Sequence, residues 1–179
     1  MAALAKSSGF TMIELMMTVA IGSIVLMLAV PSFRYVTNSN RIAAEINGLL
    51  GDLQFARSEA IKEGRTVTVC ISSDGSNCLN PNPAAWQNGW IVFSDPANTG
   101  VPAVGSILRV QKTFSGTDTF LASNALTAVT FNREGYAAGI AAGQLFTLHD
   151  STNTSAWTRC LSLNLVGQMT SERVGGACT

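Results

Sequence analysis

Charged residues are scarce in this chain, and the few that are present balance in sign. Asp, Glu, Lys and Arg make up 12% of the 179 residues, with eleven acidic and eleven basic side chains. A balanced charge gives no strong field of either sign, and phosphate recognition requires clustered positive charge. The composition therefore disfavours nucleic acid as a partner.

Catalytic and metal-binding signatures are also missing. The sequence has no Gly-x-Ser-x-Gly, His-Glu-x-x-His, Gly-x-Gly-x-x-Gly or P-loop motif. Its single histidine, His149, stands beside Asp150 at the end of an expected strand, where a solvated imidazole is the usual role. No Cys-x-x-Cys pair occurs, and the spacing of the four cysteines does not suggest a zinc site. We predict a protein that is not an enzyme and has no catalytic residue, metal or cofactor.

The chain does contain one apolar run of membrane length, at residues 10–30. These 21 residues carry Glu14 as their only charge. As a helix they would span roughly 30 Å, one hydrocarbon core. A signal peptide is disfavoured because its apolar region is about 7–15 residues long and is followed by a small-x-small cleavage site. A plain membrane anchor fits the length, but an acid retained in lipid is costly and indicates a function.

The apolar run is preceded by a specific string, Gly-Phe-Thr-Met-Ile-Glu at residues 9–14. It resembles the processing site of type IV pilins and of the pseudopilins of type II secretion, and Pro31 matches a proline of many mature pilins. The resemblance implies that prepilin peptidase cuts after Gly9 and that Phe10, the new first residue, is N-methylated. Glu14 lies about one helical turn from that residue. Its carboxylate could pair with the α-amine of a neighbouring subunit at low dielectric, which implies a role in assembly.

Helical periodicity continues after Pro31. Six apolar residues recur at alternating spacings of four and three, and Gly64 is the expected C-terminal cap. The six are Ile42, Ile46, Leu49, Leu53, Ala56 and Ala60. We expect this stripe to pack on the protein's own sheet rather than on a partner.

From Arg65 onward the period changes from 3.6 to 2, and turn-rich pieces separate short apolar segments. Strands are expected at 66–71, 90–93, 107–110, 127–131, 144–148 and 160–165. One long helix followed by short strands predicts an α+β fold, in which an antiparallel sheet or sandwich packs on the second half of the helix. The expected segments are a leader at 1–9, a transmembrane assembly helix at 10–30, its amphipathic continuation at 31–63 and a β-rich periplasmic head at 64–179.

Several blocks in the second part of the chain are similar to the GspH/FimT family. They lie at residues 56–60, 70–78, 89–95 and 131–135. The family comprises minor pilins of type IV pili and the H-type pseudopilin of type II secretion. The resemblance implies a structural subunit that helps to initiate or cap a pilus or pseudopilus. It also implies one pass through the inner membrane, with the N-terminus cytoplasmic and the head periplasmic. The implied partners are prepilin peptidase and other minor and major pilins or pseudopilins.

Disulfides are the favoured state of the four cysteines, because an exported head lies in an oxidising compartment. Free buried thiols are the alternative, and three connectivities are possible. Cys70–Cys78 and Cys160–Cys178 are favoured because each closes a local loop. Each bond would contribute about 3 kcal/mol in the chain-entropy model.

One branch of the family binds DNA in natural transformation and carries a Gly-Arg-x-Arg string shortly before its last cysteine. This chain has Gly-Gln-Met-Thr at residues 167–170, so both arginines are missing. Arg159 and Arg173 remain nearby as candidate DNA contacts. A DNA receptor is therefore the alternative function, and the altered motif weakens it.

Overall fold

The computed structural model describes residues 9–140, 142–173 and 178. The chain divides into two compact units, Met1–Ser39 and Asn40–Thr179. One helix, α1 (Met12–Glu63), contributes to both units. The expected leader at residues 1–9 lies outside the described part except for Gly9, and the expected boundary at residue 31 stays a prediction.

In the second unit, the predicted apolar stripe of α1 is confirmed as a core-facing surface. All six residues of the stripe, from Ile42 to Ala60, are buried. The helix ends at Glu63, and the next residue, Gly64, takes a left-handed φ of 66°. The Arg65 amide donates to the Ala60 carbonyl at 3.3 Å, as in a Schellman cap. The second half of the helix is thus amphipathic and closed by the glycine that the sequence indicated.

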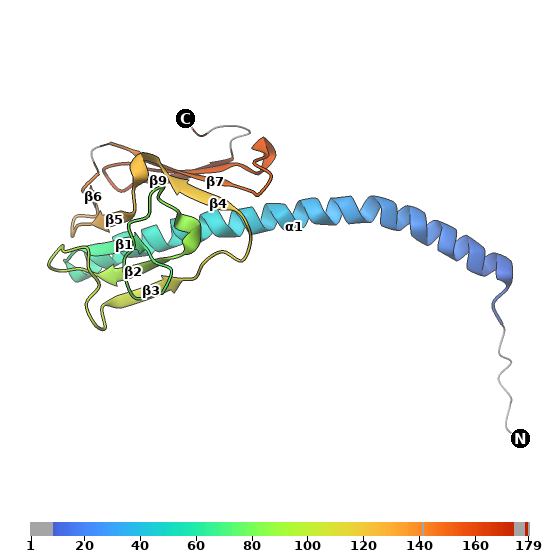
Figure 1. Cartoon of the computed structure of the whole chain (residues 1–179), viewed down its shortest axis with the longest axis horizontal. Coiled ribbons are helices and arrows are strands. Elements are labelled where there is room, and N and C mark those ends of the chain that lie inside the picture. The colour runs from blue at the N-terminus through green and yellow to red at the C-terminus, as the bar shows by residue number, and fades with distance from the viewer. Residues whose placement is uncertain (1–8, 141, 174–177, 179) are drawn as a thin grey trace, which may run out of the picture. The chain divides into compact units, whose positions relative to one another are not determined.

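Two antiparallel sheets form the rest of the second unit (Figure 1). The first sheet has the order β3-β2-β1-β5-β6 and the second has the order β4-β7-β8-β9. The strands of the first sheet are β1 (Val67–Ile71), β2 (Trp90–Ser94), β3 (Ile107–Gln111), β5 (Ala128–Phe131) and β6 (Ala137–Ala138). Those of the second sheet are β4 (Thr119–Ala122), β7 (Gln144–His149), β8 (Arg159–Leu163) and β9 (Met169–Arg173).

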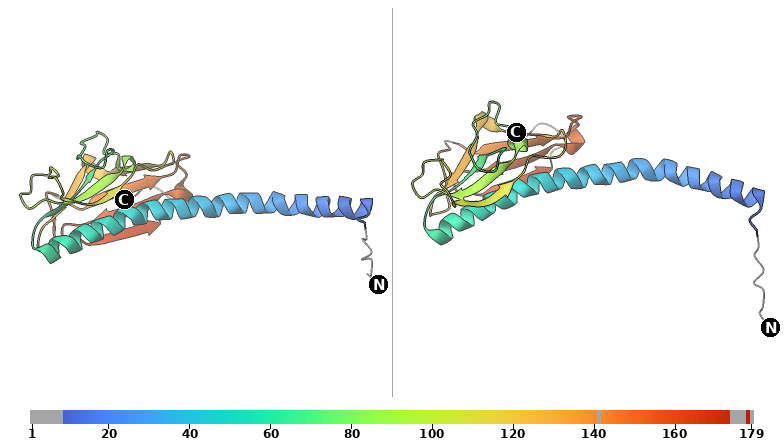
Figure 2. Two further views of the ribbon diagram at one scale, coloured as in Figure 1. Left: turned by 90° about the horizontal axis from the view of Figure 1, so that it is seen from below. Right: turned by 60° about the horizontal axis from the view of Figure 1, so that its bottom comes forward.

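One hydrophobic core joins the helix to both sheets. The stripe of α1 packs with inward side chains of the first sheet, such as Val69 and Trp90, and of the second, such as Phe146 and Leu161. The Trp86 ring meets the Phe146 ring edge to face, with centroids 5.3 Å apart. Figure 2 shows α1 running alongside both sheets in this unit. The predicted α+β fold is confirmed. Of the two expected arrangements, a single sheet or a sandwich, the structure has the sandwich of two sheets.

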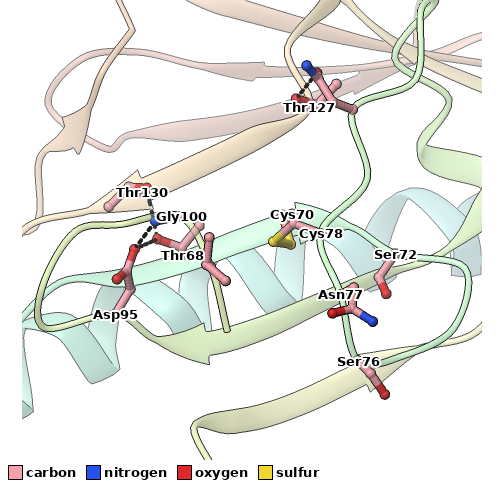
Figure 3. Close-up of a disulfide and its surroundings, with 12 residues drawn as sticks. Thr68, Cys70, Ser72, Ser76, Asn77, Cys78, Asp95, Gly100, Thr127 and Thr130 are labelled. Carbon is pink, nitrogen blue, oxygen red and sulfur yellow. Dashed lines mark hydrogen bonds between the residues drawn. A yellow bond between two sulfur atoms is a disulfide. The ribbon is translucent and has the colours of Figure 1, made fainter. Parts of the chain in front are cut away.

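The outer face of the first sheet carries a second, smaller core. Cys70, Ile91 and Phe93 are buried there, and Cys78 packs against them. The Cys70–Cys78 disulfide fastens the loop after β1 onto this face (Figure 3). Residues from both faces of β1 are therefore buried, which explains why all five of them are apolar or small.

The loop after β2 is tied to the same face by a buried carboxylate. Asp95 is buried and accepts hydrogen bonds from the Thr99 and Gly100 amides at 2.9 and 2.7 Å. It also accepts from the Thr68 hydroxyl at 3.4 Å, and Thr68 pairs with the Thr130 hydroxyl at 2.9 Å (Figure 3). A buried carboxylate with several donors is satisfied without a metal ion.

All six expected strands are present, within one or two residues at their ends. Three strands were not expected: β4, β6 and β9. β6 has two residues, too few for any periodicity. β9 is a mostly polar edge strand, Met-Thr-Ser-Glu-Arg, and it lacks the apolar alternation that marks a half-buried strand.

Candidate assembly site

The processing motif lies at the start of α1. Gly9 and Phe10 precede the helix and are exposed, with 77% of Phe10 accessible. Thr11 caps the helix, since its Oγ1 accepts from the Glu14 amide at 3.3 Å. The Thr-x-x-Glu spacing is that of a capping box, and it places an acid in the first turn, where the helix dipole favours negative charge.

Glu14 forms no ion pair with any other residue that the structure describes. The residue is exposed. The local structure thus gives Glu14 a role in starting the helix.

The first unit exposes almost all of its apolar side chains. Within the described residues, α1 is the one helix long and apolar enough to cross a membrane. Its hydroxyls bond to the helix's own carbonyls, as in Thr18 to Leu15 at 2.9 Å and Ser23 to Ala20 at 2.8 Å. Such bonds satisfy polar groups inside lipid or inside a bundle of helices. The length, hydropathy and internal hydroxyl bonds of the segment therefore suit an apolar environment.

Both disulfides have the connectivity that the local loops favoured. Cys70 bonds Cys78, and Cys160 in β8 bonds Cys178 near the C-terminus. The second bond brings the end of the chain back to the outer face of the second sheet. There are no free cysteines among the described residues.

The two candidate DNA contacts lie opposite each other in the second sheet. Arg159 in β8 pairs with Arg173 in β9 in the strand register. The Arg159 side chain is buried, and its guanidinium donates to the carbonyls of Thr158 at 3.0 Å and Ala156 at 3.4 Å. A buried guanidinium engaged with backbone is poorly placed to meet a phosphate. The arrangement does not favour the DNA receptor.

Three features of the structure were not anticipated from the sequence. Arg57 of α1 bonds two separate turns, and a cluster of Arg41, Glu45 and Asp118 lies between α1 and the segment before β4. The Thr11 cap was also missed. The Thr-x-x-Glu spacing in the sequence indicates the cap. The Arg57 contacts and the Arg41–Glu45–Asp118 cluster join residues more than 70 positions apart, so no local sequence pattern indicates them.

No arrangement in the described residues resembles a catalytic or metal centre. His149 lies at the end of β7 with its Nδ1 3.1 Å from the Thr158 hydroxyl. No group of three or more potential metal ligands occurs in the part of the chain that the structure describes.

A capped membrane-length helix that carries a two-sheet head defines a pilin-like protein. The family model for the type II transport protein GspH matches residues 45–167, and that for the prokaryotic N-terminal methylation motif matches residues 4–30. Because the first match covers more than half of the chain, this chain belongs to the GspH family and is a minor pilin or pseudopilin of the GspH/FimT type.

Solved structures support the fold. Two crystal structures of the type IV minor pilin FimU from Pseudomonas aeruginosa strain PAO1 are similar to this chain. The structure in space group P21 is 23% identical, with a TM-score of 0.58, covering 78% of this chain and 92% of FimU. The structure in space group P65 is 24% identical, with a TM-score of 0.54, covering 73% and 90%. No curated protein sequence matches the chain.

Proposed function

We propose that this protein is a minor subunit that helps to initiate or cap assembly of a type IV pilus or type II secretion pseudopilus. The observation that carries the proposal is the exposed apolar half of α1, which begins with a capped first turn and with Glu14, a carboxylate that forms no ion pair with the other described residues. Such a surface is costly in water and is buried either in lipid or among the helices of a filament.

The proposal includes a processing step and an orientation. Prepilin peptidase removes residues 1–9, and Phe10 becomes a methylated N-terminus. The apolar helix first rests in the inner membrane, with its N-terminus cytoplasmic and the head periplasmic. The methylation-motif match at residues 4–30 and the two disulfides of the head support this arrangement, since disulfides persist in oxidising compartments.

In the assembled state, Glu14 meets the α-amine of a neighbouring subunit. Cleavage at Gly9 creates this amine four residues before Glu14, so each subunit offers one cation and one anion at the same end of its helix. In a low-dielectric environment an unpaired carboxylate is strongly disfavoured. The pair therefore sets the axial position of one helix against the next, and the heads make contacts with other minor subunits.

Substitution of Glu14 tests the proposal. Glu14→Ala removes the charge and should leave cleavage and membrane insertion intact, while recovery of the protein in sheared filament fractions falls at least tenfold. Glu14→Asp keeps the charge and should retain part of the recovery. Glu63→Ala, at the other end of α1, is the matched control and should behave as the wild type. Equal recovery of Glu14→Ala and wild type would refute the assembly role of this residue.

A further inference from the structure

Two carboxyl groups and one guanidinium meet between α1 and the segment that leads into β4. Arg41 and Glu45 lie one turn apart on α1, and Asp118 stands just before β4. The Arg41 guanidinium donates to Asp118 Oδ1 at 3.0 Å. The Asp118 side chain is fully buried and Glu45 is half-buried. Two potential negative charges therefore stand beside one positive charge.

Each of the two carboxyl groups has one buried oxygen that lacks a donor. Among the described residues, Glu45 Oε2 and Asp118 Oδ2 have no hydrogen-bond partner. Asp118 acts on Glu45 directly, since its charge and a hydrogen bond with it both raise the pKa of Glu45. Ionised carboxylates only accept hydrogen bonds, so two of them cannot satisfy one another. A single proton held between them provides the missing donor and removes one of the two charges.

The electrostatic surroundings favour retention of that proton near neutral pH. Burial raises the pKa of Glu45 to about 7, with repulsion by Asp118 and the hydrogen bond to it acting in the same direction. Arg41 opposes the shift and is outweighed. Arg41 on α1 and Asp118 on the facing segment are the charged groups that act on Glu45. The neighbouring side chains Trp90 and Gln111, from β2 and β3, do not titrate in this range.

Residues 112–118 connect β3 to β4 and are called the strap here. The Arg41–Asp118 ion pair fastens the end of the strap that leads into β4. The middle of the strap is held independently, because the Phe114 amide donates to the Gln87 carbonyl at 3.0 Å and the Phe114 ring packs on Trp90. The Arg41–Asp118 ion pair of the cluster ties residues 115–118 to α1. A cavity of about 390 Å³ lies beside the cluster, lined by Glu45, Trp90, Phe114 and their neighbours.

We propose that Glu45 and Asp118 share one proton, and that loss of this proton releases residues 115–118 from α1 and widens the cavity beside Trp90. The head thus contains a pH-sensitive latch. The trigger is the repulsion between the half-buried Glu45 carboxylate and the buried Asp118 carboxylate, and the element that moves is the last part of the strap. The inference depends on the fold of the second unit and not on the assembly role of Glu14.

The direction of the pH effect follows from the raised pKa. Below about pH 4.5 Glu45 is protonated in both the folded and the unfolded state, and its contribution to stability is constant. Between about 4.5 and 7 the unfolded chain loses this proton while the folded head keeps it. The folded state then binds more protons, so the free energy of unfolding decreases as pH rises. Above about pH 7 the decrease levels off.

The test uses the mature full-length chain in detergent micelles. Urea unfolding of the head, followed by tryptophan fluorescence between pH 4.5 and 8, is compared for the wild type, Glu45→Gln and Glu59→Gln. A glutamine at position 45 is neutral and donates to Asp118 at every pH. We expect the wild-type unfolding constant to rise on the order of tenfold relative to Glu45→Gln across this range, allowing for partial exposure. Glu59→Gln, on the same helix, should follow the wild type.

Two further measurements decide the inference even if Glu45→Gln folds poorly. The side-chain carboxyl carbon of Glu45 in the wild type should titrate by NMR with a midpoint near pH 7. As the pH rises, amide hydrogen exchange in residues 115–118 should accelerate severalfold more than the intrinsic pH dependence of exchange requires. The Phe114 amide is the internal reference. A midpoint near the ordinary value of 4.5, or pH profiles of wild type and Glu45→Gln that run parallel, would overturn the proposal.

Discussion

Gly167 lies directly against the carbonyl oxygen of Gly135, although the two residues belong to turns of different sheets. A Cβ on Gly167 would overlap that oxygen, and both glycines have left-handed backbones, with φ of 74° and 81°. Arg57 of α1 joins the contact, because its Nε donates to the Gly135 carbonyl at 2.9 Å and its Nη2 to the Val166 carbonyl at 3.1 Å. One arginine of the helix thus holds a turn of each sheet.

Loss of this contact should destabilise the head. Arg57→Ala removes two charge-assisted hydrogen bonds and should lower the free energy of unfolding by about 2 kcal/mol. Gly167→Ala should cost at least as much, because the methyl group conflicts with the Gly135 carbonyl and the backbone is left-handed. Gly100→Ala is the matched control, since its φ of 69° is similar but a Cβ there meets no neighbour. Urea unfolding measures all three, and equal losses for Gly100→Ala and Gly167→Ala would contradict the role of the close contact.

The same turn explains why the altered motif disfavours DNA. Gly167 keeps the glycine of the Gly-Arg-x-Arg string, at a turn with a left-handed backbone, whereas Gln168 and Thr170 stand where the string has its two arginines. We expect no saturable binding of a short DNA duplex by the mature chain in detergent at physiological salt. Any binding at low salt should fall steeply as salt increases. Micromolar binding that Arg173→Ala abolishes would contradict this prediction and restore the DNA-receptor alternative.

The two disulfides should contribute unequally. Chain entropy alone gives each about 3 kcal/mol. Cys70 is also buried with Ile91 and Phe93, so replacing it leaves a cavity in the smaller core. The double variant Cys70→Ala/Cys78→Ala should therefore unfold at lower urea than Cys160→Ala/Cys178→Ala. Equal midpoints for the two double variants would show that the packing contribution is negligible.

Processing should depend on the small residue at the cleavage position. Gly9→Val places a β-branched side chain at the scissile bond, and we expect uncut protein to accumulate. Gly22→Val makes the same change inside the apolar segment and should be cut normally. Intact mass of the membrane-extracted protein distinguishes the two. A wild-type species that begins near Ser32, or an uncut wild-type chain in cells with active prepilin peptidase, would contradict cleavage after Gly9.

The sequence predicts those parts of the fold that depend on local periodicity. The stripe from Ile42 to Ala60 and the alternation around Val69 are visible without coordinates, and so is the Gly64 cap. The edge strands β6 and β9 were missed because one is too short and the other too polar to show a period. The Arg57 contact and the Glu45–Asp118 pair unite segments that are distant in the chain. The local sequence around Arg57 or around Glu45 does not indicate which distant residue each of them contacts.

The central claim is that the exposed apolar half of α1 packs against other pilin subunits. A photoreactive amino acid at Val25, in cells that produce filaments, tests it directly. We expect a crosslinked product with another pilin or pseudopilin, identified by mass spectrometry, that disappears when Glu14→Ala is introduced. Crosslinks to lipid alone, or subunit crosslinks that persist unchanged with Glu14→Ala, would contradict it.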